Sequence, residues 1–147
     1  MTPDEVKDKA RRFIDEVFNK HNLKYAEENL SEEYVEHSPY PPVTGSDKQA
    51  ALDSFKAILD SSDDIHAEII EVVSDGRQVA IRARYSGTDT GGFMPGLEPT
   101  RKRYEVEGID IATIDPDGMF SEHAGIPDVG TAMQQLGLLP AGPPPSA

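Results

Sequence analysis

The spacing of the apolar residues changes once along this chain, at the acidic segment from Asp60 to Asp64. Before this segment apolar residues recur every three or four positions, as on one face of an amphipathic helix, and after it they alternate as in a β-strand. Most of the helices are therefore expected before this segment and most of the strands after it. Such segregation predicts an α+β fold in which helices cover one face of a curved sheet.

The N-terminal half carries start signals for helices. Thr2 and Glu5 form a capping-box pattern with Pro3 at the first helical position, and Ser46 with Gln49 forms a second such pattern. The expected elements are a first helix of about four turns after Thr2, a second helix from about Leu23 to Leu30, a short strand from Glu33 to His37, and a third helix through residues 50–59.

The C-terminal half has the pattern of an antiparallel meander. Asp75-Gly76 and Asp117-Gly118 are hairpin signals between runs of β-branched residues. We expect strands over residues 65–73, 79–85, 100–114 and 119–126, with a glycine-rich link between the second and the third. Asp128 is a suitable N-cap for a final helical turn, and residues 140–147 form a proline-rich tail that we expect to be disordered.

The length and charge of the chain exclude several classes of protein. Its 147 residues suit one domain over residues 1–139, and no apolar run is long enough to span a bilayer. A net charge of −13 opposes binding to a phosphate backbone, so we expect no nucleic-acid partner and no membrane partner. The start of the chain lacks the apolar segment of a signal peptide, which favours a cytoplasmic protein.

Sequence motifs for cofactors and metals are missing as well. The glycines form neither GxGxxG nor GxxxxGK[ST], no histidine pair has the HExxH spacing, and the chain has no cysteine. A nucleophile elbow of the GxSxG type is also missing. We therefore expect no cofactor and no metal site.

Asp110 is the carboxylate whose position most needs an explanation. It lies between Ile109 and Ile111 in the middle of an expected strand, and both faces of this strand are largely apolar there. An ionised carboxylate shielded from water is costly unless it is paired, so Asp110 needs a proton or strong hydrogen bonds. Two explanations stay open: a structural carboxylate that satisfies a neighbouring group, or a pocket that uses acid–base chemistry.

Two of the four histidines lie where they could belong to a site. His37 directly precedes a proline-rich loop, and His123 lies late in the last expected strand. Neither belongs to a metal-ligand spacing, so a zinc or iron site is a weak interpretation of this pair.

Four segments of the chain together resemble the SnoaL-like polyketide cyclase family, also called ester cyclases. They are RRFIDEVFNKHN, YVEHSP, YSGTDTGGFMPGLEPTRKRYEVEGIDI and SEHAGIPDVGTAMQQLGLLP, and the resemblance runs from about Val6 to Pro140. This family belongs to the superfamily of nuclear transport factor 2 and ketosteroid isomerase. The resemblance implies a cone-shaped fold, in which a strongly curved antiparallel sheet wraps around N-terminal helices and an apolar pocket lies in the mouth.

The resemblance also assigns roles to residues at matching positions. Asp128 follows the EH of the last strand, where SnoaL-like cyclases carry their base, and Asp110 falls where ketosteroid isomerase holds a protonated Asp. His37 stands at the position of the isomerase's base and Phe13 at that of its tyrosine, which argues against steroid isomerisation. Gly108 replaces the arginine of limonene epoxide hydrolase, so the machinery for opening an epoxide is incomplete.

The function that the resemblance implies is a cofactor-independent cyclase or isomerase-type enzyme, a lyase or isomerase that acts on a hydrophobic carbonyl substrate, polyketide or ester-like. Asp128 is its expected base, assisted by Asp110 or His37, and His37 and His123 are the expected tuning or proton-transfer partners. The residues expected to bind substrate are Phe13, Val17, Tyr40, Phe55, Tyr85, Phe93, Met94, Tyr104, Val106 and Ala124. The alternative is a non-catalytic domain of the same fold that binds a small molecule or dimerises.

A homodimer through the exposed face of the sheet is also implied by the resemblance. Ile109 and Ile111 are candidates for this interface. The alternative is that both isoleucines pack beneath the helices.

Overall fold

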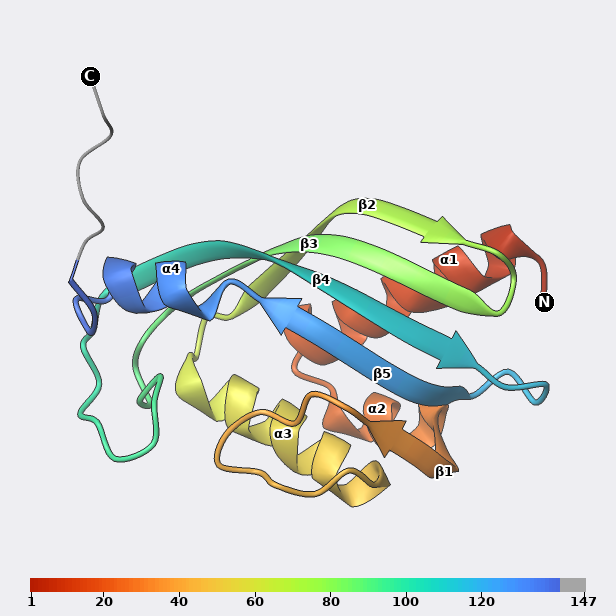
Figure 1. Cartoon of the computed structure of the whole chain (residues 1–147), viewed down its shortest axis with the longest axis horizontal. Coiled ribbons are helices and arrows are strands. Elements are labelled where there is room, and N and C mark those ends of the chain that lie inside the picture. The colour runs from red at the N-terminus through yellow and green to blue at the C-terminus, as the bar shows by residue number, and fades with distance from the viewer. Residues whose placement is uncertain (141–147) are drawn as a thin grey trace.

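The structure, a computed structural model, describes residues 1–140 as helices on one side of a curved sheet (Figure 1). The predicted tail lies outside the described residues, except for Pro140. In chain order the elements are α1 (Pro3–Ile14), the π-helical turn η1 (Asp15–Asn19), α2 (Leu23–Asn29), β1 (Leu30–Glu36), α3 (Lys48–Ser61), β2 (His66–Ser74), β3 (Gln78–Thr88), β4 (Arg103–Ile114), β5 (Phe120–Pro127) and α4 (Val129–Gln135). No helix in this part of the chain is long and apolar enough to cross a membrane.

The helices begin at capping side chains. Thr2 Oγ1 accepts from the backbone N–H of Glu5 at 3.2 Å and the Glu5 carboxylate accepts from the Thr2 N–H at 2.7 Å, which confirms the predicted capping box of α1. The cap predicted for α3 is wrong by one residue, because Asp47 rather than Ser46 accepts from the N–H of Ala50, at 2.9 Å. Asp47 directly precedes the first helical residue, so its carboxylate is the one within reach.

The sheet confirms the predicted α+β cone, with one difference at its edge. The strand order is β1-β5-β4-β3-β2, and the pairs from β2 to β5 form the predicted antiparallel meander. Strand β1 instead pairs with β5 in parallel. The sheet is therefore mixed, because β1 joins the edge of β5 that the meander leaves free.

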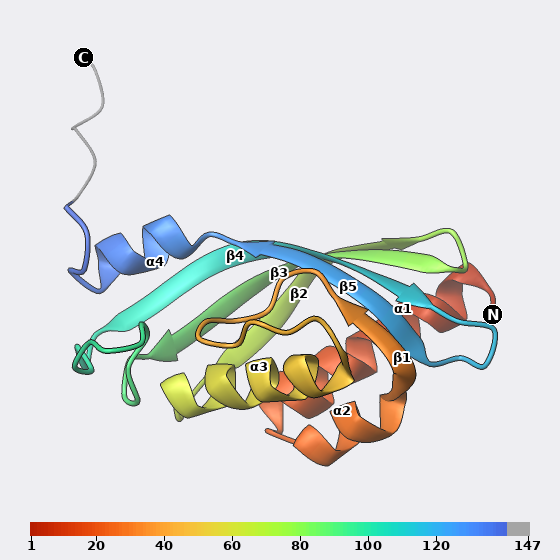
Figure 2. The ribbon, with the colours of Figure 1, turned by 60° about the horizontal axis from the view of Figure 1, so that its bottom comes forward.

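The sheet arches over the helices, so that it has an inner face toward α1 and α3 and an outer face away from them (Figure 2). Strands in such a sheet twist, and the twist produces the curvature. The inner face of β3 packs against α1, in a core that includes Val6, Ala10, Phe13, Val79, Ile81 and Ala83.

Strand β4 alternates between the two faces as predicted. Tyr104, Val106 and Gly108 are buried on the inner face, whereas Ile109 and Ile111 are 56% and 46% exposed on the outer face. The alternative that these two isoleucines pack beneath the helices is therefore wrong.

Candidate active site

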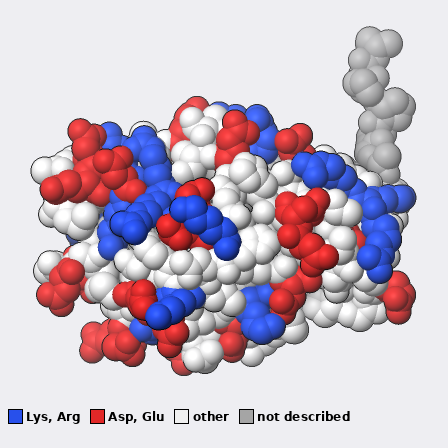
Figure 3. Space-filling model, turned by 180° about the vertical axis from the view of Figure 1, so that it is seen from behind, with Lys and Arg blue, Asp and Glu red and all other residues white. Residues whose placement is uncertain are grey.

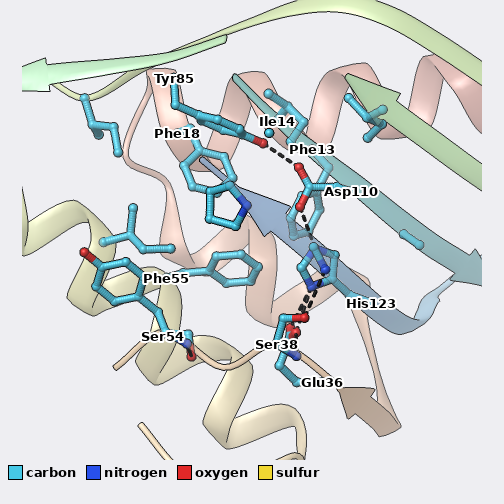
Figure 4. A pocket seen from close by; sticks show the side chains of 18 of the residues that line it. Phe13, Ile14, Phe18, Glu36, Ser38, Ser54, Phe55, Tyr85, Asp110 and His123 are labelled. Carbon is cyan, nitrogen blue, oxygen red and sulfur yellow. Dashed lines mark hydrogen bonds and ion pairs between the residues drawn. The ribbon is translucent and has the colours of Figure 1, made fainter. Parts of the chain in front are cut away.

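A cavity lies between the inner face of the sheet and the helices. Its volume is about 200 Å³, and its wall contains all five phenylalanines of the chain and four of the five tyrosines. The rings pack against one another, since the centroid of Phe18 lies 5.9 Å from that of Phe55 and 5.8 Å from that of Tyr85 (Figure 4). A cavity of this composition suits a compact apolar ligand.

Polar side chains enter this apolar cavity in one connected row, which we call the polar chain: Tyr85, Asp110, His123 and Glu36 (Figure 4). The hydroxyl of Tyr85 donates to Asp110 Oδ2 at 2.7 Å, and Asp110 Oδ1 lies 2.9 Å from His123 Nε2. On the other side of the imidazole, Nδ1 lies 2.8 and 3.0 Å from the two oxygens of Glu36. Each of the four side chains comes from a different strand: β3, β4, β5 and β1 in the order of the row.

The strand register accounts for these contacts. Glu36 at the end of β1 is the parallel partner of His123 on β5. On the other side of β5, His123 is the partner of Ala112, so Asp110 is its diagonal neighbour on the same face of β4. Diagonal neighbours on one face of an antiparallel pair are within reach of long side chains.

His123 carries a positive charge at neutral pH. Burial by itself lowers the pKa of this imidazole, but the hydrogen bonds to Asp110 and Glu36 and the charges of both carboxylates outweigh burial and raise the pKa to about 9. The geometry agrees, because both ring nitrogens face carboxylate oxygens and only an imidazolium can donate from both. The cavity thus holds one buried cation between two carboxylates.

The two ends of the polar chain are supported by donors. Glu36 is 3% exposed, and it accepts from the hydroxyl of Tyr34 at 3.4 Å and from the backbone N–H of Ser38 at 2.9 Å. Burial, and then the charge of the neighbouring carboxylate, raise the pKa of both Tyr34 and Tyr85 above the ordinary value. Both phenols therefore stay protonated and act as donors.

Asp128, the predicted base, lies outside the cavity. It is the exposed N-cap of α4 and accepts from the Thr131 N–H at 3.1 Å and from the Thr131 hydroxyl at 2.7 Å. These two hydrogen bonds hold the pKa of the Asp128 carboxyl below its usual value. The structure thus supports the other role predicted for Asp128, that of a helix cap. It does not bring Asp128 together with Asp110.

His37 also lies away from the cavity. Its side chain is half exposed, and its Nε2 lies 2.6 Å from Glu122 Oε1. Because Glu36 and His37 are neighbours at the end of a strand, they point to opposite sides of the sheet. Of the four predicted catalytic residues, the structure therefore brings together Asp110 and His123 alone.

Most of the residues predicted to bind substrate line the cavity, namely Phe13, Tyr40, Phe55, Tyr85, Phe93, Tyr104 and Val106. Val17 is fully buried in the core instead. Met94 follows Phe93 in the loop between β3 and β4 but does not line the cavity, and Ala124 is exposed on the outer face of β5. Ala124 faces outward because it alternates with His123 and Gly125, which both line the cavity.

Two loops meet at the cavity wall, which includes Tyr40 and Phe93. The hydroxyl of Tyr40, in the loop after β1, donates to the backbone oxygen of Phe93, in the loop after β3, at 3.2 Å. The backbone N–H of Tyr40 donates to Ser54 Oγ on α3 at 3.0 Å. The ring of Phe93 is thereby held at the cavity wall.

Glu36 and Tyr34 are the site residues that the sequence reasoning missed. The available signal was the alternation within YVEH, where Glu36 is in phase with an aromatic residue and out of phase with Val35. In the structure Tyr34 and Glu36 are buried and Val35 is exposed. An acid in phase with buried residues of a strand is a candidate for a paired, functional carboxylate.

Two other kinds of site have little support in residues 1–140. No group of three or more His, Asp or Glu side chains among them is arranged to hold a metal ion. On the face drawn in Figure 3, Lys and Arg side chains are interspersed with Asp and Glu side chains rather than gathered into one basic surface. The cavity with its polar chain is therefore the candidate active site.

Solved structures with this architecture match most of the chain. TsrD from Streptomyces laurentii gives a TM-score of 0.81 at 22% identity, over 95% of this chain and 99% of that chain. IdmH from Streptomyces antibioticus gives 0.73 at 27% identity, over 89% and 98%. An LEH-like epoxide hydrolase from M. tuberculosis gives 0.65 at 12% identity, over 91% and 90%. No sequence among the curated proteins matches the chain.

These likenesses, together with the cone and its cavity, define the class: an α+β protein of the nuclear transport factor 2-like fold. Within this class the chain belongs to the SnoaL-like polyketide cyclase family, whose model matches residues 8–136. This confirms the resemblance found in the sequence. Family and neighbours support an enzyme that processes small molecules.

Proposed function

We propose that the protein is a cofactor-independent cyclase or isomerase-type enzyme, which acts by acid–base chemistry on a hydrophobic carbonyl substrate, polyketide or ester-like. The observation that carries this proposal is that the charged side chains of the polar chain line an otherwise apolar cavity. The side chains of Asp110 and His123 are 19% and 24% exposed, whereas the side chain of Glu36 is only 3% exposed. A substrate in the cavity therefore meets Asp110 and His123.

In the proposed reaction Asp110 is the base. It takes a proton from a carbon next to a carbonyl, so that the C–H bond breaks, an O–H bond forms on Asp110, and the electron pair moves onto the carbonyl oxygen. The hydroxyl of Tyr85 and Nε2 of His123 donate to Asp110 and hold its carboxylate in place, and the positive charge of the His123 imidazolium stabilises the negative charge on the enolate oxygen. The enolate carbon then closes a ring onto a second carbonyl, whose oxygen takes the proton from Asp110.

Asp110 fits the role of base better than Asp128 does. Asp128 is exposed, lies outside the cavity lining, and has a pKa lowered by the hydrogen bonds from Thr131, which makes it a weaker base. Asp110 lines the cavity and is hydrogen-bonded to the imidazolium of His123. A carboxylate and a proton donor side by side in one cavity are a usual arrangement for acid–base catalysis.

Deuterium exchange tests the proton abstraction without knowledge of the natural substrate. The protein is incubated in D₂O with a panel of uncharged aryl ketones, α-tetralone first, and deuterium at the carbon beside the carbonyl is followed by mass spectrometry. We expect wild-type protein and the control Asp128→Asn to accelerate exchange over buffer, and Asp110→Asn to lose the acceleration. Loss with Asp128→Asn and retention with Asp110→Asn would return the role of base to Asp128.

A homodimer through the outer face of the sheet is part of this proposal. Val35, Ile109, Ile111 and Ile126 form an apolar patch there, which we call the outer patch, and Ile126 is 81% exposed. Ile109 and Ile126 are opposite one another across β4 and β5. Exposed apolar patches of this kind mark interaction surfaces, and a second copy related by a two-fold axis would bury this one.

A further inference from the structure

Gly125 lies at an unexpected place for a glycine, inside strand β5 and on the face that lines the cavity. Glycine weakens the interior of a strand, and a positive φ is the usual reason to keep it. Gly125 does not have a positive φ. A glycine without that need marks a place where another group comes close to the backbone.

Asp110 is the group that comes close. The register puts Gly125 directly opposite Asp110, while His123 lies diagonally from it. To reach Nε2 of His123, the Asp110 carboxylate lies over the backbone of Gly125. A Cβ atom at position 125 would overlap Asp110 Oδ1 and would lie 3.0 Å from His123 Nε2 and 3.1 Å from His123 Cε1.

The backbone of Gly125 is also fixed from its other side. Its N–H donates to Ser38 Oγ at 3.1 Å, and the N–H of Ser38 donates to Glu36 Oε1 at 2.9 Å. The strand therefore has little freedom to move away from Asp110, because such a movement would disturb the contact that holds Glu36. The space over position 125 is therefore occupied by the Asp110 carboxylate, with the His123 ring beside it.

We propose that Gly125 is a positioning residue of the active site, which leaves open the space in which Asp110 and His123 form their hydrogen bond. The inference rests on the proposed function, because it concerns the pair to which that function assigns the chemistry. Gly125 touches no substrate in this proposal; it acts through the placement of Asp110. A single methyl group at this position separates the pair.

The test compares Gly125→Ala in two backgrounds, wild type and Asp110→Ala. Gly130→Ala in α4 is the control, because a Cβ there meets only Asp128 Oδ1, at 4.0 Å. Two quantities are measured in full-length protein: the titration of the His123 ring by NMR and the temperature of unfolding. Neither needs turnover, so a failure of the proposed reaction would leave this test intact.

We expect the His123 ring in Gly125→Ala to titrate well below the value near 9 of the wild type, because the contact with Asp110 is lost. The unfolding temperature should fall by several degrees in the wild-type background and change little in the Asp110→Ala background, where the methyl group takes the vacated space. Gly130→Ala should leave the His123 titration unchanged. With a ketone that undergoes exchange, the loss in Gly125→Ala should appear in kcat more than in KM.

Two results would overturn the inference. One is an unchanged His123 titration in folded Gly125→Ala. The other is an equal loss of stability in both backgrounds, which would place the clash elsewhere. Should Gly125→Ala fail to fold, recovery of folding in the double variant with Asp110→Ala supports the inference, and failure of both contradicts it.

Discussion

Strands β4 and β5 present opposite surfaces on alternate residues. On the inner face Asp110 and His123 carry charge inside an aromatic cavity, and on the outer face Ile109 and Ile126 are exposed to solvent. The usual order of polar outside and apolar inside is thus reversed at the centre of the sheet. The difference teaches that the two faces suit different roles: the inner face suits the proposed substrate, and the outer face suits the proposed contact with a second copy of the chain.

The two faces also differ in the surroundings of their ion pairs. On the outer side, Arg82 of β3 forms two hydrogen bonds with Glu107 of β4, at 3.0 and 3.1 Å, in a partly exposed setting. On the inner side, His123 lies between Asp110 and Glu36, and all three side chains are less than a quarter exposed. Exposed ion pairs contribute little to stability, whereas removal of one partner from a buried ion pair is strongly destabilising.

The largest effect that would sharpen this comparison is expected at Asp110. Asp110→Asn keeps the shape of the side chain but removes its capacity to take up a proton, so we expect turnover or ketone exchange to fall about 10²–10⁴-fold. Thermal unfolding of the same variant is the control for correct folding. Exchange at the wild-type rate in folded Asp110→Asn would show that the inner pair is structural.

The pH dependence of stability is the next largest effect. The pKa of His123 is raised from 6.5 to about 9, so its contribution is fully present below pH 6.5 and is lost as the pH rises through 9. The loss should be on the order of 3 kcal/mol. Free energies of unfolding by denaturant at pH 6 and pH 10 measure it, and His123→Gln should show a drop smaller by that amount. Equal drops in both proteins would contradict a buried imidazolium.

A lysine on the outer face should break the proposed dimer and leave the inner face intact. Ile126→Lys places a charge at the most exposed position of the outer patch, and we expect light scattering to show a shift from dimer to monomer. Leu97→Lys, in the loop between β3 and β4, is a control at a 49% exposed leucine outside the patch. A wild-type protein that stays monomeric at high concentration would contradict the proposed homodimer.

The smallest effect is expected where the inner face ends, at Asp128. Asp128→Ala removes the cap of α4, so the free energy of unfolding should fall by about 1 kcal/mol while turnover changes only a few-fold. Thr131→Val removes one of the two cap contacts and should have a smaller effect still. A loss of turnover as large as that of Asp110→Asn would contradict the structural role.

The local features of the fold could be predicted from the sequence. The hairpin turns and the alternation along β4 depend on neighbouring residues, and both are found in the structure where the pattern puts them. Asp110 was recognised for the same reason, since a carboxylate between two isoleucines breaks a local pattern. The position of Asp128 as a helix cap is local too, and it was among the roles that the sequence allowed.

The partners of Asp110 could not be predicted in the same way. Glu36 reaches His123 only because β1 lies parallel to β5, and no turn signal links two strands so distant in the chain. The contact between Asp110 and His123 depends on the register of β4 and β5, which a shift by one residue would abolish. Pairing between distant strands is a property of the assembled sheet rather than of any segment.

The pairing of β1 with β5 also determines how late the polar chain can form during synthesis of the protein. Glu36 and His123 are 87 residues apart, so α1, α2, α3, β1 and the hairpin of β2 and β3 are all synthesised before His123 is added. Contacts between residues so far apart in the chain form late, because the entropic cost of closing the loop must be met before the contacts can stabilise the fold. Until β5 docks, Glu36 has no cation beside it and β4 keeps an open edge that invites association with other chains. The formation of the polar chain is thus a mark that the whole sheet has closed.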